Sequence, residues 1–344
     1  PTLTIFRCPL WVPAKPSGSK RVLHLASFAL SSFPVMLRQI FWRPDVVWVV
    51  EPALFCAPQA WLVARLSGGK AWLHVQDFEV DAAFDLGILK SSSLRRVVLA
   101  LERWLMRRFD RVSTISDRML EKLRSKGVES NKAILFSNWV DLAAIHPMRE
   151  EDGFRRQLGI SPDRIVALYS GNMGEKQGLE VVLKAAVRLQ GSADVHFVLC
   201  GDGAAKARLH REYEALPNVT WLPLQPVDKL NELLNMADIH LLPQRGDAAD
   251  LVMPSKLLGM LASGRPILAT VLPDTQVAEV VSRCGVVTPP GDVVAFAEAL
   301  QNLAADAEGR GRLGEAGRLI AEKQYSQGAV LHHFEQELKR VVHA

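Results

Sequence analysis

The sequence predicts an α/β protein made of two doubly wound domains, and three observations support this fold class. At 344 residues the chain is longer than one hydrophobic core usually serves, so about two domains of ordinary size are expected. Short apolar runs alternate with longer stretches of helical periodicity, which is the rhythm of βαβ units in a parallel sheet. The rhythm lapses once, in the charged segment 148–163, and this segment marks the expected domain boundary.

The first domain is expected to cover residues 1–148. Its apolar runs predict four strands, at 46–50, 70–75, 111–115 and 133–136. The stretches between these runs have helical spacing, at 53–67, 92–109 and 116–126.

The second domain is expected to cover residues 149–327, with helices between its strands. The strands are predicted near 165–170, 196–200, 219–222, 238–242, 266–270 and 285–288. Residues 328–344 have apolar side chains at helical spacing and predict a final helix that packs back toward the N-terminal domain. Ligands of doubly wound sheets bind at the carboxyl ends of the strands, so the two domains are expected to face each other across a cleft.

The composition excludes several classes of protein. Hydrophobic residues make up 49% and charged residues 23%, which argues against disorder, collagen and coiled coils. Cys8, Cys56, Cys200 and Cys284 lie far apart, so neither a zinc site nor a disulfide framework is expected. The longest uncharged stretch, 22–37, has 16 residues, fewer than the roughly 20 that span a bilayer. A cytoplasmic protein without a transmembrane helix is expected.

The charge is distributed unevenly along the chain. Residues 1–149 hold 21 Lys and Arg against 12 Asp and Glu, whereas residues 150–344 hold 20 against 25. The basic half therefore suits an anionic partner, which is a membrane surface, a nucleic acid or a phosphorylated substrate.

Segments 33–43 and 94–109 combine cationic with apolar side chains. Their arginines stand beside Phe41, Trp42 and Trp104 and are Arg38, Arg43, Arg95, Arg96, Arg103, Arg107 and Arg108. This combination is typical of an interfacial helix on an anionic membrane, and the alternative is two core-packed helices with solvated charges. No recognised nucleic-acid motif accompanies it, so no nucleic-acid partner is expected.

The segment 251–269 predicts a helix that starts with an anion site. Pro254 and Ser255 are good helix-start residues, so Lys256 stands in the first turn. Free backbone N–H groups and the positive end of the helix dipole favour an anion there, and the ammonium group adds charge. The alternative is a solvated surface lysine on an ordinary helix.

Two glycine-containing turns follow predicted strands. Gly171 and Gly174 allow backbone amides to approach a ligand closely, which predicts a phosphate cradle at 170–174. The turn 201–203 lacks the third glycine of a dinucleotide fingerprint, because Lys206 stands there, so NAD is not expected.

The motif P-S-K-L-L-x-M-L-A-S-G-R-P at 254–266 resembles the nucleotide-binding helix of family 4 glycosyltransferases, which have the GT-B fold of two Rossmann-like domains. The resemblance extends, in the expected order, over residues 72–79, 137–141, 170–178, 201–203 and 241–244. The chain is similar in particular to the colanic-acid and O-antigen types of bacterial polysaccharide glycosyltransferase.

This resemblance implies a retaining, metal-independent hexosyltransferase without a cofactor. It implies transfer of a sugar from a nucleotide-diphosphate donor to a lipid-linked oligosaccharide, by a protein held peripherally on the inner face of the cytoplasmic membrane. The open alternatives are a GT-B nucleotide-sugar epimerase and an inactive membrane-associated binding protein.

The resemblance also assigns roles to residues. The catalytic set is His74, Lys256 and Lys176, and the substrate-binding set is Gly171, Asn172, Gly174, Gln177, Gly203, Arg245, Pro254 and Ser255. A histidine at the place of His74 faces the transferred sugar, while the alternative is a structural histidine. A metal site of the form H-x-x-D-x-E is not expected, because three side chains would have to converge from one extended segment.

Four positions depart from the family pattern. Asn172 stands where the loop usually has Arg, and Gln177 stands where it usually has Lys, with Lys176 one residue earlier. Leu251 and Gly259 occupy the places of the paired glutamates, so the usual ribose contact is absent. The Gly201–Gly203 turn lies beside the nucleotide in the family, although a purely structural turn fits equally well.

The amino-terminal domain of this fold normally begins with a strand and a glycine-rich loop. Before Gly68 the chain has only Gly18, so the first βα unit of the domain is expected to be missing.

Overall fold

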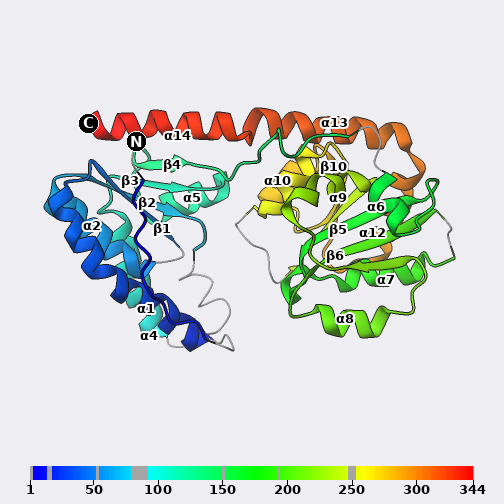
Figure 1. Ribbon diagram of the computed structural model, residues 1–344, viewed down its shortest axis with the longest axis horizontal. Coiled ribbons are helices and arrows are strands. Elements are labelled where there is room, and N and C mark those ends of the chain that lie inside the picture. Colours follow the sequence, from blue (N-terminus) through cyan, green and yellow to red (C-terminus); the bar gives the residue numbers. More distant parts are fainter. Residues whose placement is uncertain are drawn as a thin grey trace. The chain divides into compact units, whose positions relative to one another are not determined.

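The computed structural model describes residues 3–13, 18–51, 54–78, 92–148, 152–191, 194–246 and 253–343. The chain forms two compact units, one of residues 1–137 with 332–344 and the other of residues 138–331 (Figure 1). Each unit contains one sheet whose strands all pair in parallel, with helices packed against it. The predicted α/β class is therefore confirmed.

The sheet of the first unit has the strand order β1-β2-β3-β4. Its strands are β1 (Val46–Glu51), β2 (Lys70–Val75), β3 (Arg111–Thr114) and β4 (Ala133–Leu135), as predicted. The helical segments are α1 (Gly18–Arg38), η1 (Gln39–Trp42), η2 (Leu54–Cys56), α2 (Ala57–Ser67), α4 (Ser92–Met106) and α5 (Asp117–Ser125).

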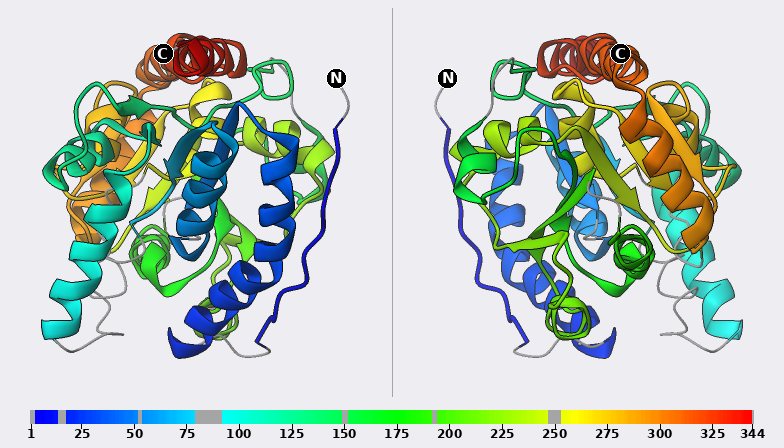
Figure 2. Two further views of the ribbon diagram at one scale, coloured as in Figure 1. Left: turned by 90° about the vertical axis from the view of Figure 1, so that its left-hand side faces the viewer. Right: turned by 90° about the vertical axis from the view of Figure 1, so that its right-hand side faces the viewer.

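Local sequence signals explain where helices of the first unit begin and end. Helix α2 has a proline in its first turn and ends at Gly68, whose φ of 81° is left-handed. Helix α5 begins where the Ser116 side chain accepts a hydrogen bond from the Met119 N–H. Helices α1 and α2 lie side by side (Figure 2), and α2 packs on β1 and β2.

The end of the last helix, α14 (Gln327–His343), belongs to the first unit. Val341 is buried with Trp72 and Ile134, and Phe334 and Leu338 pack against them. The apolar stripe of the final helix therefore contributes to the core beneath the first sheet.

The sheet of the second unit has the strand order β10-β9-β8-β5-β6-β7. Its strands are β5 (Ile165–Asn172), β6 (Val195–Asp202), β7 (Val219–Leu222), β8 (Ile239–Pro243), β9 (Ile267–Thr270) and β10 (Gly285–Thr288). The helical segments are α6 (Asp152–Gln157), η3 (Glu175–Gln177), α7 (Glu180–Arg188), α8 (Lys206–Tyr213), η4 (Val227–Lys229), α9 (Leu230–Met236), α10 (Ser255–Ala262), α11 (Gln276–Val281), α12 (Val293–Ala305) and α13 (Ala307–Gln324).

Two separate cores cover the two faces of this second sheet. Side chains of a strand alternate between the faces, so Val166 and Leu168 join one core while Ala167 and Tyr169 join the other. Helices α9, α10 and α11 supply the first core, and α7 and α12 supply the second. Burial on both faces explains why these strands are continuous apolar runs in the sequence.

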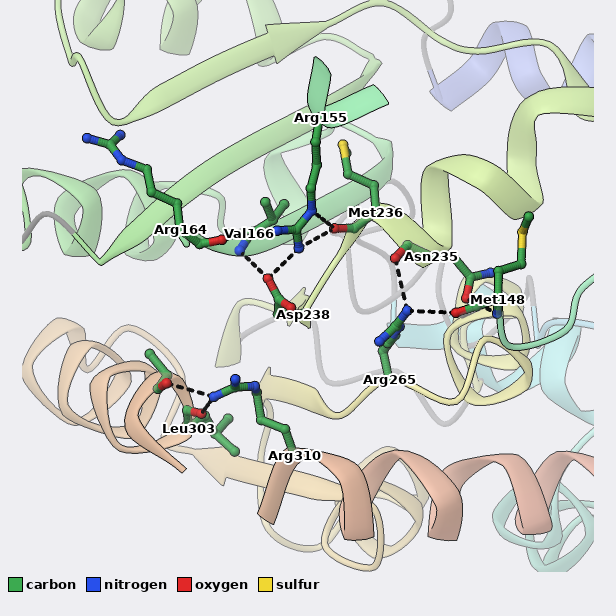
Figure 3. A network of polar contacts seen from close by, with 11 residues as sticks. Met148, Arg155, Arg164, Val166, Asn235, Met236, Asp238, Arg265, Leu303 and Arg310 are labelled. Carbon is green, nitrogen blue, oxygen red and sulfur yellow. Dashed lines mark hydrogen bonds and ion pairs between the residues drawn. The ribbon is translucent and has the colours of Figure 1, made fainter. Parts of the chain in front are cut away.

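The unit boundary lies earlier than the boundary expected at residue 148. The Val140 N–H donates to the Tyr325 carbonyl at 2.8 Å, and the Met148 N–H donates to Asn235 Oδ1 at 2.8 Å. Figure 3 shows Arg265 donating to the carbonyl oxygens of both Met148 and Asn235. These bonds attach residues 138–148 to the second unit, which the local sequence pattern does not reveal.

The charged segment that marked the expected boundary is also part of the second unit. Arg155 on α6 donates to the Met236 carbonyl at 2.9 Å and pairs with Asp238 at 2.6 Å (Figure 3). Asp238 in turn accepts from the Val166 N–H at 2.7 Å. The charges that resembled a linker therefore satisfy backbone groups at the ends of β5 and α9.

Two buried histidines predict that stability falls in mild acid. Burial lowers the pKa of His74 to about 4, with a hydrogen bond to Ser113 opposing, and burial together with Arg265 lowers the pKa of His240 to about 3. Both have an ordinary value of 6.5, so the unfolded chain binds more protons below that pH and stability falls from pH 6.5 toward 4. Urea unfolding at pH 7 and pH 5 measures this, and equal midpoints would contradict it.

Candidate active site

Two glycine turns meet at the carboxyl ends of β5 and β6. The Met173 N–H donates to the Asp202 carbonyl at 2.7 Å, which ties the loop after β5 to the end of β6. A Cβ at Gly201 would lie 1.9 Å from the Gly171 oxygen, and one at Gly203 would lie 2.5 Å from Asn172 Oδ1. Glycine is thus required at 201 and 203 by the close approach of the two turns.

Lys256 lies against the first of these turns. It is the second residue of α10, which starts at Ser255, directly after Pro254. Its ammonium nitrogen is 4.4 Å from the centroid of the Tyr169 ring and 3.4 Å from the Tyr169 hydroxyl. A Cβ at Gly171 would lie 3.4 Å from Lys256 Cδ. Lys256 is therefore packed beside the loop, which does not support a freely solvated surface lysine.

The ammonium group of Lys256 lies in a partly buried environment. Burial lowers the pKa of Lys256 to about 8, and burial also raises the pKa of the Tyr169 hydroxyl. The Tyr169 hydroxyl donates to the Asn172 carbonyl at 2.5 Å. Among the described residues, this hydroxyl is the one polar group that Lys256 contacts, so the ammonium is suited to an incoming anion.

A second group of predicted residues lies farther along the same loop. The Arg245 N–H donates to the Lys176 carbonyl at 3.1 Å. Gly178 has a left-handed φ of 61°, and a Cβ there would lie 3.0 Å from Arg245 Cγ. A hollow of about 300 Å³ is lined here by Gly178, Glu180, Lys184, Arg245 and Gly291, among others. Gln177 and Gly174 form the turn that precedes Gly178.

Sequence reasoning missed the side chains that hold this loop. Arg208 on α8 pairs with Glu175 at 2.8 Å and with Glu180 at 2.6 Å. Burial raises the pKa of Glu180, but the hydrogen bond from Arg208 leaves it below its ordinary value. No local sequence pattern links Arg208 to the loop. Tyr169 is different, because a tyrosine inside an apolar strand indicates a buried hydroxyl that needs a hydrogen-bond partner.

His74 lies in β2 and is enclosed. The residue is 2% exposed, and its ring contacts the rings of Trp48 and Phe136, at centroid distances of 5.7 Å and 5.1 Å. Its Nδ1 is 2.8 Å from Ser113 Oγ, and its Nε2 is 2.8 Å from the Gln76 amide nitrogen. The imidazole is therefore enclosed by side chains of the first unit, and a direct contact of His74 with a sugar stays a prediction.

Two earlier expectations include residues that the structure does not describe: the absent glutamates at positions 251 and 259, and the rejected metal motif that ends at Glu79. Leu251 and Glu79 lie outside the described residues. Gly259 is described and packs on Leu234, since a Cβ added at Gly259 would lie 3.3 Å from Leu234 Cδ1. Within the described ranges, no cluster of three or more His, Cys, Asp or Glu side chains could hold a metal ion.

The basic and apolar segments of the first unit expose aromatic and aliphatic side chains. Val97, Leu101 and Trp104 form one stripe of α4 and are 65%, 60% and 46% exposed. In η1, Phe41 and Trp42 are 88% and 75% exposed. Arg108 lies 4.8 Å above the Trp104 ring. The described helices include none with the length and apolar character needed to cross a membrane.

Comparison with protein families matches most of the chain. Residues 2–139 match the family described as a glycosyl transferase 4-like domain, and residues 164–306 match glycosyl transferases group 1. The chain is 44% identical over 268 residues to the putative colanic acid biosynthesis glycosyl transferase WcaI of Escherichia coli K12, covering 76% of this chain and 66% of that protein. It is 25% identical over 309 residues to the probable glycosyltransferase WbjE of Pseudomonas aeruginosa, covering 88% and 76%.

Solved structures agree on the fold. Sucrose-phosphate synthase from Thermosynechococcus elongatus has a TM-score of 0.75 at 17% identity, covering 96% of this chain and 80% of that one. Anabaena HepE in complex with UDP-glucose has a TM-score of 0.70 at 15% identity, covering 95% and 84%.

Fold and family together define a GT-B glycosyltransferase. The chain belongs to family 4 of these enzymes, among those of the bacterial polysaccharide biosynthesis type. It spans 66% of the length of its colanic acid relative.

Proposed function

We propose that the chain transfers a sugar from a nucleotide-diphosphate donor to a lipid-linked saccharide, with retention of the anomeric configuration. The observation that supports this most is the placement of Lys256 in the first turn of α10, against the glycine turn at Gly171. A helix amino end, loop amides and an ammonium group together favour a diphosphate. The solved HepE, which has the same fold, is in complex with UDP-glucose.

In this proposal the chemistry rests on electrostatic stabilisation of the leaving group. The departing diphosphate gains negative charge as the sugar becomes oxocarbenium-like, and Lys256 with the α10 amino end would stabilise that charge. Lys176 and Arg245 supply further positive charge at the far end of the loop, where their backbones are joined. Removing one such donor commonly raises the barrier by about 3 kcal/mol. The proposal assigns no protein nucleophile, metal ion or cofactor.

Product analysis separates this function from its alternatives. The protein is incubated with radiolabelled nucleotide sugars, with and without a bacterial lipid extract. A transferase moves label into the organic phase only when lipid is present, whereas an epimerase converts the donor without lipid. An inactive binding protein changes neither.

We further propose that the first unit attaches peripherally to an anionic membrane, at the cytoplasmic face where the lipid-linked acceptor would lie. The exposed stripe of α4 supports this, since a solvated face of a helix normally carries polar side chains. The stripe is flanked by Arg95, Arg96 and Arg103, which are exposed as well. Apolar insertion combined with basic residues, each contributing about 1 kcal/mol near an anionic surface, is sufficient for reversible attachment.

Vesicle co-sedimentation tests this attachment. We expect binding to vesicles that contain phosphatidylglycerol but not to phosphatidylcholine alone, and we expect Leu101→Asp to reduce it about tenfold, because a charge replaces an inserted side chain. High salt should weaken it, since exposed charges are screened over about 8 Å at physiological ionic strength. Val187→Asp, at a residue that is 47% exposed on α7, is the control. Equal binding to both vesicle types, or to neither, would contradict the proposal.

A further inference from the structure

Tyr169 joins the two layers of helices of the second unit at the carboxyl end of β5. Its side chain is fully buried in the core that α7 and α12 supply. Lys256 comes from α10, whose Leu257 and Leu258 belong to the core on the other face of the sheet. The two side chains nevertheless meet, because the Lys256 ammonium lies 4.4 Å from the centroid of the Tyr169 ring. The first turn of α10 is therefore joined to the opposite layer through this tyrosine.

The hydrogen bonds of the Tyr169 hydroxyl define its orientation. A phenol has a single proton, and the Asn172 carbonyl accepts it at 2.5 Å. The oxygen can therefore only accept from Lys256, whose Nζ lies 3.4 Å away. The negative face of the ring attracts the same ammonium group. Tyr169 thus holds Lys256 both through its ring and through an oxygen that the loop after β5 has oriented.

Gly171 leaves room for the stem of the lysine. Its φ of 142° is a conformation that residues with a side chain rarely adopt. A Cβ there would lie 3.4 Å from Lys256 Cδ and 4.0 Å from the Tyr169 hydroxyl. The lysine stem therefore runs closely past the backbone of the loop, and one hydroxyl contacts both the loop and the ammonium.

We propose that Tyr169 is the positioning residue of the diphosphate site, holding the Lys256 ammonium beside the glycine turn, an inference that rests on the proposed function. A lysine side chain has many rotamers, and fixing it on a ligand costs entropy. Because Tyr169 already holds Lys256 in the folded protein, the positive charge is preorganised for an anion. Among the described residues Lys256 forms no ion pair, and burial alone lowers its pKa.

A double-mutant cycle on the full chain tests this role. Calorimetry measures the binding of UDP, GDP, ADP and dTDP to the parent, and the tightest of them is titrated into Tyr169→Phe, Lys256→Ala and the double variant. We expect Tyr169→Phe to weaken binding about 3- to 10-fold, because the ring stays while the oxygen that accepts from Lys256 is lost. In the Lys256→Ala background the same change should alter the affinity by less than about twofold. A tyrosine with only a packing role would weaken binding by the same factor in both backgrounds.

The pH dependence of binding gives a readout that a packing role would not move. The Tyr169 oxygen stabilises the charged form of Lys256, whereas burial favours the neutral form. Without the hydroxyl, the loss of nucleotide affinity on raising the pH should therefore begin about half a pH unit or more below its onset in the parent. The nucleotide titrates identically in both experiments, so the difference between them reports on the protein.

Tyr213→Phe is the matched control for the loss of a phenol hydroxyl. Tyr213 is the last residue of α8 and belongs to the same core as Tyr169. It is 9% exposed, and its hydroxyl interacts with Glu212. Tyr213→Phe should leave the nucleotide affinity and its pH dependence at the parental values.

A measurement on the parent covers the case in which Tyr169→Phe fails to fold. Lysine labelled with ¹³C gives ε-methylene signals for Lys256 and for Lys323, an exposed lysine of α13, and each is assigned by its absence from the alanine variant. Because the Lys256 head group lies over the Tyr169 ring, its ε-methylene protons should resonate upfield of those of Lys323. Coincident signals would contradict the contact on which the role of Tyr169 depends.

The outcomes separate this inference from the proposed function. A parent that binds none of the four nucleotides contradicts both. A parent that binds one of them more tightly than Lys256→Ala does, while Tyr169→Phe behaves like Tyr213→Phe or weakens binding equally in both backgrounds, contradicts the role of Tyr169 alone.

Discussion

Replacing Lys256 with alanine is expected to weaken UDP binding about 10- to 100-fold while leaving the fold intact. The substitution removes an ammonium that lies beside the Gly171 turn, and a hydrogen bond to a charged group contributes about 1.5 to 3 kcal/mol. The cost in packing is small because Lys256 is only partly buried. Calorimetric titration with UDP measures the affinity, and thermal unfolding checks the fold.

The pH dependence of the same titration identifies the charge responsible. Burial lowers the pKa of Lys256 from 10.5 to about 8, so the ammonium is present below about pH 8 and is lost above it. The UDP dissociation constant should therefore rise between pH 7.5 and 9.5, by up to about tenfold per pH unit. Lys256→Arg should remove this dependence, because arginine stays protonated. Lys323→Ala, at an exposed lysine in the last turn of α13, should behave like the parent.

Unchanged UDP affinity in Lys256→Ala, or an equal loss in Lys323→Ala, would contradict the placement of the diphosphate. Lys256 would then be an ordinary residue of the α10 amino end.

Replacing Gly201 with alanine is expected to destabilise the second unit by about 3 kcal/mol or more, an overpacking effect at the upper end of the usual range. A Cβ there would lie 1.9 Å from the Gly171 oxygen, far inside van der Waals contact, and the atom it meets is backbone that cannot rotate away. Relief requires β5 and β6 to separate at the loop that carries the predicted phosphate cradle. UDP affinity should therefore fall together with the urea midpoint.

Gly191→Ala is the control, since a Cβ at that glycine meets nothing within 4 Å. It should leave both the urea midpoint and UDP binding close to the parental values. A Gly201→Ala protein that unfolds at the parental midpoint would show that β5 and β6 do not approach each other as described.

The strands could be predicted because both sheets are parallel and their strands are continuous apolar runs. The end of β5 could not be predicted from the sequence. The strand continues to Asn172 by pairing with Asp202 on β6, and Gly171 gives no local signal for this pairing. The structure divides the chain after residue 137, earlier than the expected 148, for a related reason. The residues that bind segment 138–148 to the second unit, such as Asn235 and Tyr325, are remote in the sequence.

The candidate site was predictable where its residues share a motif. The helix start at Pro254–Lys256 and the glycine turn at Gly171 were both evident, and the structure places them together. The contact of Lys256 with Tyr169 and the ion pairs of Arg208 depend on packing between elements, which no local pattern encodes. The enclosure of His74 likewise depends on Trp48 and Phe136, which belong to other segments.

Thermal unfolding in the presence of nucleotide sugars tests the central claim most directly, because a ligand that binds the native state raises its melting temperature by mass action. The parent and Lys256→Ala are compared with a panel of UDP-, GDP-, ADP- and dTDP-sugars at equal concentration. We predict that at least one sugar of one nucleotide raises the melting temperature of the parent and that Lys256→Ala loses most of this rise. A panel that stabilises neither protein, or both equally, would contradict a nucleotide-sugar site at Lys256.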